Sequence, residues 1–159
     1  MSESSSAVSG TRPQRPAIPA VPLLLGLGGL IPFWALAFSR VTGVGLGIPP
    51  TAVSFALATY AATILAFLGG IRWGLAMRSP DAANTGFDVG VAVVPQLIGW
   101  IGLAVPDPWR FFLLGVVVLG LGPLDRNLVA RGLAPAWFGR LRLILSLGAG
   151  AALFLAALA

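Results

Sequence analysis

The sequence predicts an all-α, polytopic membrane protein built as a bundle of five transmembrane helices. Of its 159 residues, 57% are hydrophobic and only 9% are charged, whereas a soluble domain is about 25% charged. The apolar residues also gather in five runs, each close to the about 20 residues with which a helix crosses the hydrocarbon core of a bilayer. Helices are the expected spanning element because they satisfy their own backbone hydrogen bonds in lipid.

The start of the chain differs in composition from the rest. Residues 1–19 are rich in serine and proline without periodicity, which predicts a disordered cytoplasmic tail. A mitochondrial transit peptide is the alternative, but the prolines disfavour the amphipathic helix that such a signal forms. Residues 20–159 are predicted to form the five-helix transmembrane domain, with spans at about 20–38, 51–71, 89–105, 108–124 and 141–159.

The fourth span is the weakest of the five predicted spans, because Arg110 leaves only residues 111–124 free of charge. A re-entrant hairpin of the third and fourth segments is therefore the alternative to two full crossings. Local chemistry supports the expected helix starts. Asp107 is placed to cap the fourth helix, and Thr85 with Asp88 fits a capping box that opens the third.

The arginines are distributed unevenly over the segments between the spans. Five spans put the two termini on opposite sides of the membrane. The side of the N-terminus carries Arg12, Arg15, Arg72, Arg78, Arg126, Arg131, Arg140 and Arg142, and the other side carries only Arg40 and Arg110. The positive-inside rule therefore predicts a cytoplasmic N-terminus and a C-terminus outside.

The stretch FLGGIRWG, residues 67–74, places an arginine among glycines at the end of the second span. An arginine at the bilayer centre costs about 2.5–3.5 kcal/mol, but near the interface its long side chain lets the guanidinium reach water. Arg72 beside Trp73 is thus interpreted as a topology anchor at the cytoplasmic end of the helix. The alternative is that Arg72 faces inward and binds a lipid headgroup or anionic ligand, with Asp88 or Asp125 nearby.

Small residues recur at every fourth position of the second span. Such stripes let helix backbones approach closely, which is how helices associate where lipid competes for apolar surface. The sequence therefore predicts that this stripe packs against a neighbouring helix and that the second helix lies at the centre of the bundle. Its members are Ser54, Ala58, Ala62, Ala66, Gly70 and Gly74.

The middles of the predicted spans contain no Asp, Glu, Lys, Arg or His, and the chain has no Cys or His at all. We therefore expect no enzymatic activity, no metal site and no cofactor, because metal-assisted hydrolysis and serine–histidine chemistry need those residues. Some uncharged polar side chains do lie within the predicted spans, among them Tyr60, Thr63 and Gln96. Tyr60 and Gln96 are expected to form hydrogen bonds between helices or, alternatively, to line a small-molecule cavity, whereas Thr63 is expected to bond a carbonyl oxygen of its own helix.

Two motifs are similar to those of a known family. They are Tyr60-x3-Ile64-Leu65-x-Phe67-Leu68-Gly69-Gly70-Ile71-Arg72-Trp73-Gly74 in the second span and Pro135-x-Trp137-x3-Leu141-Arg142-x2-Leu145 at the start of the fifth. Together with Gly28-Gly29-x2-Pro32-Phe33, Pro95 with Trp100, and Asp125, they resemble the domain of unknown function 3429 family, the transmembrane protein 69-like proteins. Ser146 and Phe138 depart mildly from the family's threonine and tyrosine.

The resemblance implies a small multi-pass protein of the bacterial cytoplasmic (inner) membrane, with mitochondrial relatives in eukaryotes, and it implies no established activity. The residues singled out as a packing or functional motif are Tyr60, Gly69, Gly70, Arg72, Trp73, Gly74, Gln96, Asp125, Trp137 and Arg142.

The expected function is that of a non-enzymatic assembly, scaffold or lipid-interacting factor. The expected partners are the lipid bilayer, anionic lipid at the cytoplasmic face, and a protein partner or a second copy of the chain; nucleic acid is not expected. An oligomeric small-solute transporter or channel is the alternative, in which Tyr60, Thr63 and Gln96 would share a polar cavity. A membrane enzyme would instead require Arg72, Asp88 and Asp125 to converge.

Overall fold

The computed structural model describes residues 17–45, 47–78 and 82–159, and within the last range it describes side chains from residue 85 onward. This part of the chain is all-helical, as predicted. It forms α1 (Ala20–Thr42), α2 (Pro50–Ala76), α3 (Ala82–Ala104), α4 (Trp109–Ala130) and α5 (Ala136–Ala157). All five are long and apolar enough to cross a membrane. Most of the predicted N-terminal tail lies outside the described residues.

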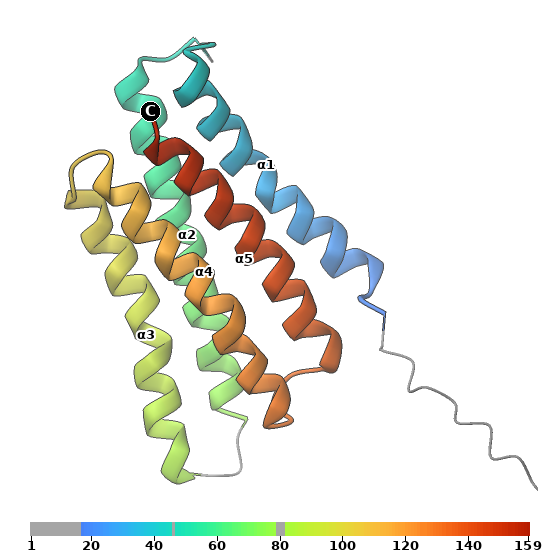
Figure 1. The fold of residues 1–159 in the computed structure, drawn as a ribbon. Helices are drawn as coiled ribbons and strands as arrows, with labels where there is room; N and C mark the ends of the chain where they lie inside the picture. The colour runs from blue at the N-terminus through green and yellow to red at the C-terminus, as the bar shows by residue number, and fades with distance from the viewer. Residues whose placement is uncertain (1–16, 46, 79–81) are drawn as a thin grey trace, which may run out of the picture.

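The helices alternate in direction, so that each one runs back along its predecessor (Figure 1). The pairs α2–α3 and α4–α5 make the most extensive contacts, and α1 packs across α5 and α2. We call the end at which α1 begins the N-terminal end of the bundle. The C-terminus lies at the opposite end, next to the end of α1 and the start of α2 (Figure 1). We call this second end the C-terminal end.

Three helices extend beyond the charged residues at which the apolar runs stop. α2 continues to Ala76, α4 continues to Ala130, and α5 begins as early as Ala136. As a result, Arg72, Asp125 and Arg142 belong to helices and not to loops. A charge inside a membrane helix is tolerated when it faces the bundle and finds a partner there, which all three do.

Neither predicted cap forms as expected. α3 begins at Ala82, before Thr85, so Thr85 and Asp88 do not open the helix. α4 begins after Pro108, which is the capping residue and offers no side-chain hydrogen bond. The carboxylate of Asp107 instead forms ion pairs with Arg40 and Arg110.

The four-residue stripe of α2 does not pack along its whole length, and the prediction fails at its end. A helix turns about 100° per residue, so positions four apart drift about 40° around the axis at each step. The last two members face open space: a Cβ atom at Gly70 or Gly74 would meet no neighbour within 4 Å. The stripe therefore winds away from the interface.

The close approach of α2 and α3 uses positions seven residues apart, which return to nearly the same face. A Cβ atom at Gly69 would collide with the carbonyl oxygen of Ala92 on α3. One at Gly99 of α3 would lie 3.1 Å from the Cα atom of Ala62. Backbone contact at these two levels explains why the pair packs so tightly. α2 also contacts α1 and α4, which agrees with its predicted central place.

The interior is filled by large apolar side chains from four helices. They interdigitate at the centre of the bundle as expected for a close-packed core. The side chains with almost no exposed surface are Phe33, Leu57, Leu65, Phe111, Leu114, Val118 and Leu153. Among the described residues α3 contributes no buried side chain to this core cluster, and α1 contributes only Phe33 and Ala37.

Candidate functional site

A buried carboxylate lies between two arginines at the N-terminal end of the bundle. The Nη1 atom of Arg72 on α2 donates to Oδ1 of Asp125 on α4 at 3.0 Å. The Nε atom of Arg142 on α5 donates to Oδ2 of the same aspartate at 2.6 Å. The three side chains are only 4–7% exposed. We call these residues the Asp125 cluster; it joins three helices by ion pairs that water barely screens.

The Asp125 cluster carries one more positive charge than negative charge. One carboxylate neutralises one of the two guanidinium groups, so a net charge of one remains inside the bundle. Three buried polar atoms beside it have no hydrogen-bond partner among the described residues: Nε of Arg72, Nη2 of Arg142 and Oγ of Ser146. Burying charged and polar donors without partners is costly, so a further hydrogen-bond acceptor here would lower the energy of the cluster.

An apolar cavity of about 370 Å³ adjoins the Asp125 cluster. It lies between α1, the second half of α2, and the first half of α5, and α4 contributes Val118. Its polar lining side chains are Arg142 and Ser146, together with the indole of Trp137. The volume falls within the range of about 300–1,000 Å³ that is typical of small-molecule sites, and a mostly apolar wall with few polar groups is typical of them too.

A second ion pair occupies the same end of the bundle. Arg131, at the end of α4, holds Asp88 of α3 through two parallel hydrogen bonds of 2.8 and 2.7 Å. Arg72 is close enough to act on Asp88 electrostatically. Arg72, Asp88 and Asp125 therefore do gather at one end. Both carboxylates, however, are already engaged by guanidinium groups.

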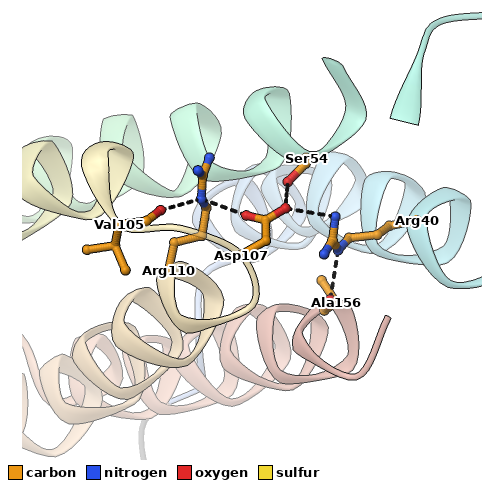
Figure 2. Close-up of polar contacts among 6 residues, drawn as sticks. All are labelled: Arg40, Ser54, Val105, Asp107, Arg110 and Ala156. Atoms are coloured by element: carbon orange, nitrogen blue, oxygen red, sulfur yellow. Dashed lines mark hydrogen bonds and ion pairs between the residues drawn. The ribbon is translucent and has the colours of Figure 1, made fainter. Parts of the chain in front are cut away.

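The opposite end of the bundle carries a cluster that the sequence analysis missed (Figure 2). Asp107 accepts from Arg40 at 3.0 Å and from Arg110 at 2.7 Å, and the hydroxyl of Ser54 also donates to it. Arg40 further donates through Nε to the Ala156 carbonyl oxygen at 2.9 Å. We call Arg40, Ser54, Asp107 and Arg110 the Asp107 cluster.

The Asp107 cluster ties four helices together at the C-terminal end. Its aspartate side chain is 32% exposed, whereas that of Asp125 is 4% exposed. The short separation of three residues between Asp107 and Arg110 was the local signal for this pairing. Nothing in the sequence pointed to Arg40, which is far away in the chain.

Tyr60 forms a hydrogen bond between helices, which is the first of its two predicted roles. Its hydroxyl donates to the carbonyl oxygen of Gly29 on α1 at 2.9 Å. Its ring lies edge-on to that of Phe33, with the ring centroids 4.9 Å apart. Thr63 bonds within its own helix, to the Tyr60 carbonyl oxygen at 2.7 Å. Thr63 and Gln96 are exposed on the outside of the bundle. These residues therefore do not share a polar cavity.

The remaining predicted residues fall on different surfaces. Arg72, Asp125 and Arg142 come together in the Asp125 cluster. Trp137 lines the cavity, as Arg142 also does. Trp73 points outward with 41% of its surface exposed. Gly69 lies in the α2–α3 contact, whereas Gly70 and Gly74 do not. Arg72 thus adopts the inward orientation that was the alternative interpretation, and it is not a snorkelling anchor.

Comparison with known proteins decides the family. The family model described as "Protein of unknown function (DUF3429)" matches residues 18–158. The chain belongs to this family. The DUF3429 match includes all five helices, so the Asp125 cluster and the cavity both lie within the family domain.

Two curated relatives carry the name Transmembrane protein 69. The chain is 38% identical to the one from Xenopus tropicalis over 127 residues, which cover 78% of this chain and 48% of the relative. It is 31% identical to the one from Mus musculus over 127 residues, which cover 79% of this chain and 50% of the relative. The chain therefore spans about half the length of these relatives. No solved structure matches it.

Proposed function

We propose that this multi-pass membrane protein is a non-enzymatic, lipid-interacting factor that associates with anionic lipid at one face of the bilayer. The observation that carries the proposal is the charge imbalance between the two ends of the bundle. Among the described residues, the N-terminal end holds six arginines and two aspartates, and the C-terminal end holds two arginines and one aspartate. The side chains of the N-terminal end thus carry a net charge of four, against one at the other end.

Exposed guanidinium groups supply the contacts with lipid headgroups. Arg78, Arg126 and Arg140 are exposed at the N-terminal end, outside the Asp125 cluster and the Asp88–Arg131 pair. Each basic residue near an anionic membrane surface contributes about 1 kcal/mol of attraction. Arginine also binds phosphate oxygens with two parallel donors. Three such residues on one rim favour anionic over zwitterionic lipid.

The same imbalance supports the orientation that we propose. The N-terminal end faces the cytoplasm of a bacterium and the C-terminus lies outside, in accordance with the positive-inside rule. The membrane would then be the bacterial inner membrane, whose cytoplasmic leaflet offers the anionic headgroups. A protein partner or a second copy of the chain would bind within the same membrane.

The proposal is tested by lipid competition. The purified protein is incorporated into lipid discs of equal phosphatidylglycerol and phosphatidylcholine content, and the lipids that remain bound are identified by native mass spectrometry. We expect phosphatidylglycerol to be enriched, and the enrichment to fall in a variant with Arg78, Arg126 and Arg140 all changed to glutamine. Added salt should lower it too, because exposed charges are screened. Equal retention of the two lipids by the unaltered protein would refute the proposal.

A further inference from the structure

We infer that the cavity beside the Asp125 cluster binds one long-chain fatty acid, with its carboxylate against Arg142 and Ser146. This inference rests on the proposed lipid-interacting function and names the ligand of a second site. It concerns the partly open cavity between α1, α2 and α5, whereas the exposed arginines concern the outer rim.

The dimensions of the cavity suit a single acyl chain. Along α1 the lining residues extend from Pro22 to Phe33, and along α5 from Trp137 to Ala149. At a rise of about 1.5 Å per residue, these stretches are about 16 and 18 Å long. A volume of about 370 Å³ spread over such a length makes a narrow, elongated space. Its walls are almost entirely apolar, so burial of a hydrocarbon chain is the main source of affinity.

The polar groups of the cavity lie part-way along its length. Arg142 lies in the second turn of α5, towards the N-terminal end, and Ser146 lies one turn further in. Apolar lining residues lie on both sides of them, with Pro22 and Trp137 towards the N-terminal end and Ala149 further in. The carboxylate therefore sits part-way along the cavity. The acyl chain lies against the apolar walls, which open to the surrounding lipid at the exposed side chains of Leu25 and Phe67.

The net positive charge of the Asp125 cluster favours an anionic ligand in the adjoining cavity. The Asp125 cluster retains one positive charge, and Nη2 of Arg142 and Oγ of Ser146 have no partner among the described residues. A carboxylate accepts several hydrogen bonds at once and supplies the missing negative charge. Both donors belong to side chains that are more than nine-tenths buried. A compact carboxylate is therefore favoured over a larger phosphodiester head, whose remaining polar atoms would be stranded away from water.

The binding test uses fluorescence quenching of the tryptophan that lines the cavity. Trp34, Trp73, Trp100 and Trp109 are exposed, so changing them to phenylalanine leaves Trp137 as the reporter. Dibromostearic acid is titrated into this protein in detergent, and native mass spectrometry counts the bound molecules. We expect saturable quenching and a stoichiometry of one. Dibromo-phosphatidylglycerol serves as the second probe. Quenching by the phospholipid alone would overturn the assignment to a free fatty acid.

Two neighbouring glycines on α1 provide a matched pair of variants. Gly29 lines the cavity and has room for a side chain, since the nearest atom to its Cβ position is the Tyr60 hydroxyl at 3.8 Å. Gly28 is exposed and has no neighbour within 4 Å. Gly29→Leu should fill the cavity and abolish saturable quenching, and Gly28→Leu should retain it. Equal quenching in the two variants would overturn the inference.

Ser146→Ala tests the head of the site independently of cavity shape. The hydroxyl has no partner among the described residues, so its removal should leave the melting temperature of the ligand-free protein unchanged or raise it. Fatty-acid binding should weaken about tenfold, the effect of losing one hydrogen bond to a charged group. Unchanged affinity would overturn the assigned carboxylate position. Enrichment of phosphatidylglycerol at the rim should survive in both Gly29→Leu and Ser146→Ala, so failure of the two proposals is distinguishable.

Discussion

Changing Asp125 to asparagine is the sharpest test of the buried cluster. The substitution keeps the shape of the side chain but leaves Arg72 and Arg142 facing each other without a negative charge. Both contacts are short, at 3.0 and 2.6 Å, and all three side chains are 4–7% exposed. Removing one partner of a buried ion pair costs about 3–5 kcal/mol. We therefore expect the free energy of unfolding to fall by that amount.

The chain offers a control with the same chemistry at its other end. Asp107 is likewise held by two arginines, at 3.0 and 2.7 Å, but its side chain is 32% exposed. Solvent screens such a pair, so Asp107→Asn should cost only about 1 kcal/mol. The free energies are compared by titrating the protein in mild detergent with sodium dodecyl sulfate and following circular dichroism. Equal losses for the two variants would show that the Asp125 cluster is not sheltered from water.

A double variant separates charge balance from packing. Asp125→Asn together with Arg142→Gln returns the cluster to one positive charge. If repulsion between the two guanidinium groups causes the loss, the double variant should be less destabilised than the sum of the two single variants. Simple additivity would contradict this explanation, since residues in one network are expected to couple.

Three further predictions concern the packing and the orientation of the bundle. Gly69→Ala should lower the free energy of unfolding by about 1–3 kcal/mol because its methyl group meets the α3 backbone, while Gly70→Ala, which faces open space, should change it by less than about 0.5 kcal/mol. Tyr60→Phe should cost about 0.5–1.5 kcal/mol by removing the hydrogen bond to Gly29, measured by the same titration; no loss would mean that this bond is replaced in lipid. A periplasmic reporter fused after Ala159 should be active and a cytosolic one inactive; the reverse pattern would contradict the proposed orientation.

The membrane spans were predictable because the apolar runs are long and nearly free of charge. Their ends were less so. In the sequence, a charged residue indicates the end of a membrane span. Arg72 and Asp125, however, are 53 positions apart in the chain and form an ion pair inside the bundle. Single-sequence reasoning evaluates the cost of an isolated charge. It has no means of assigning a partner that distant, so the inward orientation of Arg72 remained one of two alternatives.

The sequence correctly predicted that small residues of α2 make a close helix contact, but it predicted the wrong residues at the end of α2. The abundance of small residues on α2 indicated a close helix contact, and α2 does approach α3 at Gly69. The four-residue stripe nevertheless led to Gly70 and Gly74, because a regular spacing in sequence does not follow one face of a helix for long. The cavity could not be predicted from the sequence, since side chains of four helices form it and the sequence does not reveal how those helices are placed relative to one another.

The bond from Arg40 to the Ala156 carbonyl oxygen bears on how the chain assembles as it is synthesised. α1 is synthesised first and α5 last. The guanidinium of Arg40 can therefore bond the Ala156 carbonyl oxygen only after the final turn of α5 has been made. Until then α1 is held by the segments already made, through the hydrogen bond from Tyr60 to Gly29 and the ion pair of Arg40 with Asp107. Completion of this contact fastens the earliest element of the bundle to the latest one.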